Sequence, residues 1–364
     1  MVPVGTGNAD YREPTLAASG DAGAEAAEPQ ELDTAAEIRA VKVPAALHGE
    51  RLDKVLVAIA PEFSRSHLQQ LLARGHVRLD GAAAATASRR VKAGQAVQIE
   101  LVPTEESLAY RPQPMTLAVL YEDDDLLVIA KPAGLVVHPA PGNWSGTLLN
   151  GLLHRYKGAA ALPRAGIVHR LDKDTSGVMM VGKTLQAVTA LVRDIGERRV
   201  HRRYLALAHG VTAAREFTID SPIGRDPQVH VRMAVVAVAA GGRPSRTDVH
   251  RLAEIGSGRD AVSALSCTLH TGRTHQIRVH LASCGHPVLA DVLYGGWAQL
   301  GLQRQALHAF ELRLAHPVSR APLRFECPPP ADFATAWAMV CGAAMNDGAP
   351  PGQVTRYNPP QSQS

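Results

Sequence analysis

The amino-acid sequence predicts an α+β protein in which a small helix-containing domain precedes a larger domain rich in strands. Its 364 residues exceed the usual size of a single domain, so at least two domains are expected. From residue 117 to about residue 330, segments of strand composition outnumber amphipathic helices and do not alternate with them regularly. This order favours a mixed, mainly antiparallel central sheet over a doubly wound parallel sheet.

Both ends of the chain are predicted to be disordered. Residues 1–40 are rich in Ala, Glu, Gly and Pro and carry a net charge of −6, whereas the rest of the chain carries +10. Residues 348–364 are rich in Pro, Gln and Ser. Segments with so few large apolar residues cannot bury enough surface to offset the entropy of ordering. The basic body is consistent with a polyanionic partner, although many proteins without such a partner carry as much charge.

Residues 49–102 form the first predicted domain, a compact α/β unit. Apolar residues at helical spacing across residues 52–59 predict one helix. Ser64 is a typical N-cap for a second helix, which Gly75 ends. Two short strands complete the unit, at residues 77–79 and 97–101.

The second predicted domain covers residues 116–330 and follows a linker over residues 103–115, which contains three prolines. Within this domain, residues 126–130 have the composition of a buried strand. Thr184 begins an amphipathic helix, and residues 200–208 return to strand.

The segment His169-Arg170-Leu171-Asp172-Lys173-Asp174-Thr175-Ser176-Gly177 places the Asp172 carboxylate between two cations. Apolar segments at residues 165–168 and 178–181 predict flanking strands, which puts Asp172 on a loop. A carboxylate beside positive charge stays ionised, so Asp172 is suited to act as a nucleophile or a base. The alternative is a polar turn in which Gly177 supplies a positive φ. Local chemistry alone does not decide between the two.

The motif His-Arg-Leu-Asp-x-x-Thr-Ser-Gly resembles the signature of the RluA-type pseudouridine synthases. The resemblance runs from about residue 51 to about residue 330 and is closest to the RluD-type subgroup, which modifies large-subunit ribosomal RNA. Three further segments carry it: residues 139–147 (PAPGNWSGT), 272–280 (GRTHQIRVH) and 304–309 (RQALHA).

The resemblance implies an isomerase (an intramolecular transferase) that cuts the bond from ribose to uracil N1 and rejoins the sugar to C5. Asp172 matches the family's essential aspartate, and Arg278 matches the basic residue that pairs with it. Tyr204 matches the active-site tyrosine, whose ring can stack on the uracil and whose hydroxyl is a candidate acceptor for the C5 proton. The structural alternatives are an exposed strand arginine at 278 and an ordinary strand tyrosine at 204.

Five further residues are candidates for contact with the RNA. Arg170 matches the arginine that fills the space left by the everted base, and Leu265 is a candidate wall of the base pocket, unless it is simply core. Arg202 lies in an arginine-rich stretch that is either a phosphate track or solvated surface. Residues 49–102 resemble an S4-type RNA-binding domain, in which Arg65 and Arg74 would face phosphates.

Several classes of site are disfavoured. The product is an isomer of the substrate, so no redox cofactor, nucleotide or metal is expected. The four cysteines, at 267, 284, 327 and 341, have no paired spacing, which argues against a zinc site and a disulfide framework and favours a reducing cytoplasm. We find neither a signal-peptide pattern nor an apolar stretch of about 20 residues, so no membrane partner is expected.

The sequence therefore predicts a cytoplasmic, monomeric pseudouridine synthase whose partner is large-subunit ribosomal RNA or its precursor. A related synthase that acts on another ribosomal site or on transfer RNA is the nearest alternative. A noncatalytic RNA-binding ribosome assembly factor is a second. A glycosidase is a third, but it would normally require two carboxylates at a defined separation, and only Asp174 lies near Asp172.

Overall fold

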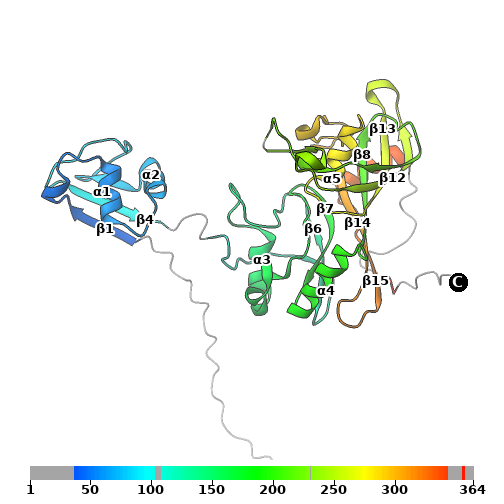
Figure 1. Ribbon diagram of the computed structural model, residues 1–364, viewed down its shortest axis with the longest axis horizontal. Helices are drawn as coiled ribbons and strands as arrows, with labels where there is room; N and C mark the ends of the chain where they lie inside the picture. The colour runs from blue at the N-terminus through cyan, green and yellow to red at the C-terminus, as the bar shows by residue number, and fades with distance from the viewer. Residues whose placement is uncertain (1–36, 103–107, 230, 343–354, 357–364) are drawn as a thin grey trace, which may run out of the picture. The chain divides into compact units, whose positions relative to one another are not determined.

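The computed structural model describes residues 37–102, 108–229, 231–342 and 355–356, and the chain divides after Val102 into two compact units (Figure 1). The predicted acidic tail lies outside the described residues up to position 36. The predicted C-terminal tail also lies outside them, except for β16 (Thr355–Arg356), which pairs with β15 of the second unit.

The first unit is a helix pair on a four-stranded antiparallel sheet of order β1-β4-β2-β3. Its main elements are β1 (Glu37–Lys42), α1 (Leu52–Ile59), α2 (Arg65–Ala73), β2 (Val77–Leu79), β3 (Ala82–Ala83) and β4 (Ala96–Leu101). Ser64 caps α2 as predicted, because its Oγ accepts a hydrogen bond from the backbone N–H of His67 at 3.2 Å. Buried aliphatic residues of both helices and of the sheet form one core.

Strand β1 corrects the predicted tail boundary. Residues 37–40 were expected to be disordered, but β1 pairs with β4 along its whole length, from Glu37 opposite Leu101 to Lys42 opposite Ala96. Most of its side chains are exposed, so the segment lacks the apolar alternation by which a strand is recognised. Backbone pairing with β4, which would otherwise have an open edge, orders it instead.

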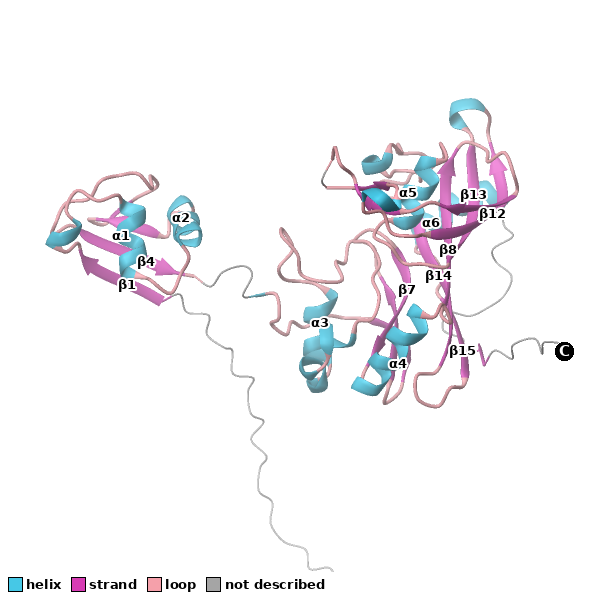
Figure 2. Ribbon diagram, in the orientation of Figure 1, coloured by secondary structure: helices cyan, strands magenta, loops and turns pink. Residues whose placement is uncertain are grey.

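The second unit is built on a ten-stranded sheet, with helices packed against it (Figures 1 and 2). Its strands are β5 (Ala118–Glu122), β6 (Leu126–Lys131), β7 (Ser176–Gly182), β8 (His201–His209), β9 (Glu216–Asp220), β12 (Arg246–Ile255), β13 (Val262–Leu269), β14 (Leu307–Ala315), β15 (Pro322–Glu326) and β16. Its helices are α3 (Leu148–Arg155), α4 (Leu185–Gly196), α5 (Gln276–Ser283) and α6 (Ala331–Cys341), and β10 (Ile223–Arg225) with β11 (Met233–Val235) forms a separate hairpin.

The sheet is mixed and mainly antiparallel, as predicted. Its order is β5-β6-β7-β14-β8-β13-β12-β9, with β15 also paired to β14, and the β7–β14 pair is parallel. At this junction Gly177 has φ 124°, and a Cβ built there would lie 2.1 Å from the carbonyl oxygen of Ala309. Gly177 therefore supplies the positive φ expected of it and also allows β14 to approach β7 closely.

The predicted linker is too long, because its second half is packed into the second unit. Residues 103–107 lie outside the described residues, but the buried side chain of Asn150 holds the segment that follows. Its Nδ2 donates hydrogen bonds to the carbonyl oxygens of Leu108, Ala109 and Arg111, at 3.1, 3.2 and 2.8 Å. Proline-rich composition indicates extended backbone, and here that backbone is packed.

Two other boundaries differ from expectation. The domain does not end at Pro330, since α6 packs Phe333 and Trp337 against the sheet beside β12 and β13. Residues 165–168 do not form a strand: the first two belong to a 3-10 turn (Pro163–Gly166), and a single bridge joins Ile167 to Val181. The loop that carries Asp172 is therefore tied to the sheet by one bridge on that side.

Replacing Trp337 with alanine is expected to lower the free energy of unfolding by about 3–5 kcal/mol, because it would leave a large cavity under α6. Urea denaturation followed by far-UV circular dichroism measures this change. Met339→Ala is the matched control: its side chain is 56% exposed on the same helix, and a loss under about 1 kcal/mol is expected. Equal losses in the two variants would show that α6 is not part of the core.

Candidate active site

Asp172 lies on the wall of a cavity of about 660 Å³ in the second unit. Its side chain is 14% exposed and projects from the loop that precedes β7. The cavity wall also includes Arg170, Arg202 and Tyr204, three of the residues predicted to meet the RNA. The loop from His270 to His275 also lines the cavity.

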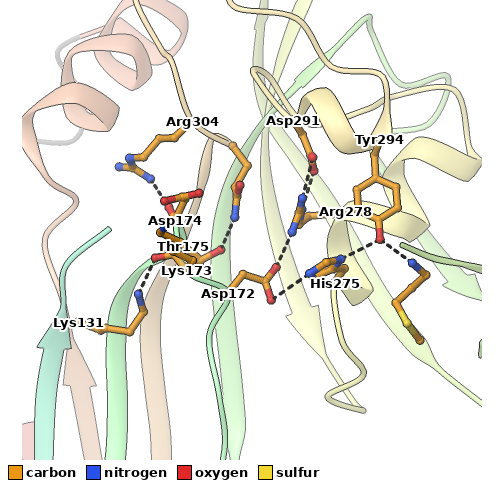
Figure 3. Close-up of polar contacts among 12 residues, drawn as sticks. Lys131, Asp172, Lys173, Asp174, Thr175, His275, Arg278, Asp291, Tyr294 and Arg304 are labelled. Carbon is orange, nitrogen blue, oxygen red and sulfur yellow. Dashed lines mark hydrogen bonds and ion pairs between the residues drawn. The ribbon is translucent and has the colours of Figure 1, made fainter. Parts of the chain in front are cut away.

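Arg278 binds Asp172 directly, as the sequence led us to expect (Figure 3). Its Nη1 lies 2.9 Å from Asp172 Oδ2, and its side chain is 7% exposed. Arg278 lies in α5 and is buried, so the alternative of an exposed strand arginine is wrong. The helix holds the guanidinium against the Asp172 carboxylate from a rigid element.

Asp291 completes the site, and sequence reasoning missed its role. Its carboxylate accepts two hydrogen bonds from Arg278, from Nε at 2.6 Å and from Nη2 at 2.8 Å. Burial alone would lower the pKa of Arg278, but the hydrogen bonds and charges of Asp291 and Asp172 outweigh it and raise that pKa. The guanidinium is thus fixed between two carboxylates. Asp291 has no basic neighbour in the sequence, so no local signal marked it.

His275 is a second residue that sequence reasoning did not single out. Its Nε2 lies 3.8 Å from Asp172 Oδ1, and its Nδ1 is 2.8 Å from the hydroxyl of Tyr294. Burial lowers the pKa of His275, although the nearby charge of Asp172 opposes that effect. The ring is therefore mainly neutral at pH 7, and it limits how far the carboxylate can turn.

Four groups hold the loop that carries Asp172 in place. The backbone carbonyl oxygens of Lys173 and Asp174 accept hydrogen bonds from the buried Lys131 Nζ (3.0 Å) and from Arg304 Nη1 (2.9 Å) (Figure 3). The other two contacts involve histidines: His169 Nε2 accepts from the N–H of Met180 at 3.0 Å, and His308 Nδ1 lies 2.9 Å from Ser176 Oγ. These contacts use mainly backbone groups, so the side chain of Asp172 remains free to face the cavity.

Tyr204 reaches the same cavity from β8 and is 6% exposed. Burial raises the pKa of its phenol, with opposing contributions from the charges of Arg202 and Asp172. The phenol is therefore protonated near neutral pH. It can donate a hydrogen bond and stack on a base, but it is not itself a ready base.

The structure does not support every predicted contact residue. Leu265 is fully buried in the core, opposite Ala206 of β8, and is absent from the cavity wall. Leu269, four residues further along β13, lines the cavity instead. Leu265 is therefore a core residue, which is the alternative that the sequence left open.

Arg65 and Arg74 lie in the first unit, on and just after α2. The guanidinium of Arg65 binds the fully buried Asp53 at 2.7 Å and remains half-exposed. Arg74 is exposed at the C-terminal end of the helix. Arg170 is also exposed, at the cavity of the second unit.

Within the described ranges, no three His, Cys, Asp or Glu side chains come together as a possible metal site. None of the helices described there is long and apolar enough to cross a membrane.

Comparison with known proteins places the chain in a family. Residues 125–283 match the family model described as RNA pseudouridylate synthase, and residues 50–97 match the S4 domain. The ribosomal large subunit pseudouridine synthase D of Xanthomonas campestris pv. campestris is 47% identical over 309 residues, which cover 81% of this chain and 90% of that protein. The chain belongs to the RNA pseudouridylate synthase family. It is therefore an isomerase with an S4 domain, which confirms the resemblance seen in the sequence.

Other relatives of this pseudouridine synthase carry the same name. The enzyme of Neisseria meningitidis serogroup B is 45% identical over 303 residues, covering 80% of this chain and 79% of that protein. Among solved structures, human RNA pseudouridylate synthase domain containing 1 is 30% identical, with a TM-score of 0.47, and the match covers 60% of this chain and 86% of that one.

Asp291→Asn is expected to lower kcat by about 10- to 100-fold with little change in KM, because the amide cannot balance the charge of Arg278 or accept both of its hydrogen bonds. Tritium release from RNA that contains 5-tritiated uridine measures the rate. The matched control is Asp260→Asn, an exposed aspartate of the same unit outside the site. Unchanged turnover in Asp291→Asn would show that Arg278 needs no second carboxylate.

The free energy of unfolding is expected to fall as the pH drops below about 6.5. Burial lowers the pKa of His308 to about 4 and that of His169 to about 3, each from an ordinary value of 6.5. Between pH 6.5 and about pH 4, these two histidines are protonated in the unfolded chain but remain neutral in the folded chain. Stability that is present above pH 6.5 is therefore lost toward pH 4.

Urea titrations at several pH values measure the slope. His308→Gln should flatten the dependence, whereas the exposed His201→Gln should leave it unchanged. An identical slope in wild type and His308→Gln would contradict the assignment.

Proposed function

We propose that this enzyme converts specific uridines of large-subunit ribosomal RNA to pseudouridine, with Asp172 as the essential catalytic carboxylate. The observation that carries the proposal is the position of Asp172, which lies at the wall of a nucleotide-sized cavity and is bound by Arg278. The names of relatives up to 47% identical support the large subunit as the source of the substrate. We expect the enzyme to act in the cytoplasm, as a monomer and without a cofactor.

The reaction requires three things of the site. The bond between ribose C1′ and uracil N1 must break, the base must turn while it stays bound, and a new bond must form from C1′ to C5. N1 gains a proton and C5 loses one, so the overall composition does not change. An ionised Asp172 can begin this sequence either by direct attack on the sugar or base, or by removing a ribose proton so that the uracil is eliminated.

Arg278 acts as the positioning group for that carboxylate. A guanidinium held by Asp291 on one edge offers Asp172 a fixed hydrogen-bond donor on the other. His275 approaches the second carboxylate oxygen, so both oxygens have a neighbour before substrate binds. Preorganisation of this kind mainly raises kcat and has less effect on KM.

Tyr204 and Arg170 are assigned to the base and to the space that it leaves. A paired uridine cannot reach Asp172, so it must be everted, at a cost of a few kcal/mol. The exposed guanidinium of Arg170 can stack in the vacated position. The protonated phenol of Tyr204 can stack on the bound uracil, which contributes roughly 1–3 kcal/mol. Deprotonation of C5 then requires water or another acceptor that works with the phenol.

The S4 domain adds a second RNA contact through Arg65 and Arg74. Arg65 is anchored by Asp53 and still half-exposed, so its charge is presented in a fixed direction. Contacts of this type should weaken steeply as the salt concentration rises.

Asp172→Asn is expected to lower turnover by at least about 10²- to 10⁴-fold while leaving RNA binding nearly unchanged, because the amide keeps the shape but cannot act as nucleophile or base. Tritium release measures turnover, and filter binding measures affinity. Asp174→Asn, in the same loop, is the matched control and should stay within a few-fold of wild type. Undiminished turnover by Asp172→Asn would overturn the role given to this residue.

Mapping pseudouridines in RNA from a strain that lacks the gene tests the substrate. Loss of modification at uridines of large-subunit ribosomal RNA is expected. Loss confined to transfer RNA would reject the proposed target but not the chemistry, and no loss of modification at all would favour a noncatalytic assembly factor.

A further inference from the structure

Arg202 presents an unpaired positive charge at the wall of the active-site cavity. It lies on β8, is 7% exposed, and lines the cavity beside Tyr204. Among the described residues it has neither an ion pair nor a hydrogen bond, and its Nε is fully buried without a partner. An arginine cannot escape this cost by losing its proton. A buried, uncompensated cation costs several kcal/mol.

The surrounding residues do not neutralise Arg202. Burial and the charge of Arg202 itself lower the pKa of His169 to about 3, so that ring is neutral. Tyr204 keeps its proton, because burial raises its pKa. Asp172 is already bound by Arg278 at 2.9 Å.

Three other arginines of this unit, unlike Arg202, are each paired with a buried carboxylate. Arg203, the next residue on β8, points to the opposite face of the sheet and binds the buried Glu311 at 3.1 Å. Arg278 is held bidentately by Asp291. Arg320 binds the buried Asp194 at 2.9 Å. In these three cases the fold supplies a carboxylate, whereas for Arg202 it supplies an open cavity.

The loop that contains Gly272 lies next to Arg202 and leaves room for the guanidinium. A Cβ built on Gly272 would lie 2.7 Å from Arg202 Nη1, so even alanine at this position would displace the charged group. The absence of a side chain at Gly272 therefore allows the Arg202 guanidinium to occupy its present position at the cavity.

We propose that Arg202 is an anion subsite of the cavity and binds a backbone phosphate next to the everted uridine. This inference rests on the proposed function. A phosphate supplies the missing negative charge and can accept two parallel hydrogen bonds from a guanidinium, whereas the carbonyl oxygens of uracil carry no net charge. Arg202 and Tyr204 project from the same face of β8 and are roughly 7 Å apart along the strand, so one nucleotide can place its base on Tyr204 and a flanking phosphate on Arg202.

Binding assays with Arg202→Met test the subsite, because methionine keeps the apolar stem and removes the charge. Affinity for a stem-loop RNA substrate should fall by about 10- to 100-fold, mainly in Kd and KM and much less in kcat. The slope of log Kd against log salt concentration should fall by about 1, which corresponds to the loss of one phosphate contact. Arg203→Met, on the opposite face, is the matched control and should bind as wild type.

A neutral linkage in the RNA identifies the ligand. Substrates carry one methylphosphonate, either at the phosphate on one side of the target uridine, at the phosphate on the other side, or at a distant position. One of the two flanking substitutions should lower the affinity of the wild type as much as Arg202→Met lowers it for unmodified RNA. The affinity of Arg202→Met should not fall further on that modified RNA. If Arg202→Met still binds more weakly than the wild type on each of the two RNAs with a neutral flanking linkage, the phosphate assignment is overturned.

Two further measurements separate an RNA-binding role from a structural one. Arg202→Met should be at least as resistant to urea as the wild type, because it removes an uncompensated buried charge; a clear loss of stability would assign Arg202 to the fold instead. Gly272→Ala should weaken binding by the wild type but not by Arg202→Met, because the atoms nearest the added Cβ all belong to the Arg202 guanidinium. Kd is measured without turnover, so these results are independent of whether Asp172→Asn abolishes catalysis.

Discussion

The site depends on one buried guanidinium held between two carboxylates. Arg278 joins the loop before β7, which carries Asp172, to helix α5 and to the segment that begins at Asp291. A buried ion pair gains little net stability, because desolvation of the charges offsets most of their attraction. Its effect is geometric: a shift of Arg278 would leave the buried Asp291 and the nearby Asp172 without their arginine. The three segments are therefore held in one arrangement before RNA arrives.

The sheet places this arrangement where its two halves meet. The strands on the β5 side and those on the β9 side join through the parallel pair of β7 and β14, directly after the Asp172 loop. Gly177 allows the two backbones to come together there, and β8 then brings Tyr204 to the neighbouring position. Residues from distant parts of the chain thus share one cavity because the strands cross over at this junction.

Much of the framework was predictable because it depends on local patterns. Apolar periodicity and the Ser64 cap identified α1 and α2, and the mixed sheet followed from the order of strands and helices. Strand β1 was missed because pairing with β4, rather than its own composition, orders it. Asp291 and His275 were missed as functional residues for a similar reason: their importance comes from contacts made across the fold. The sequence left open whether Leu265 lines the cavity or belongs to the core, because the composition of a strand does not fix the depth of each side chain, and the structure places it in the core.

The three hydrogen bonds from Asn150 redefine where the catalytic body begins. A division of the chain by composition would cut at about residue 116 and again at 330, and would remove both the segment held by Asn150 and helix α6. Tyr110, in that held segment, also borders the active-site cavity. Exchange of the S4 module between related enzymes would therefore have to keep residues 108–115 with the catalytic half. A chimera joined at residue 116 would lose part of the active-site rim along with the S4 module.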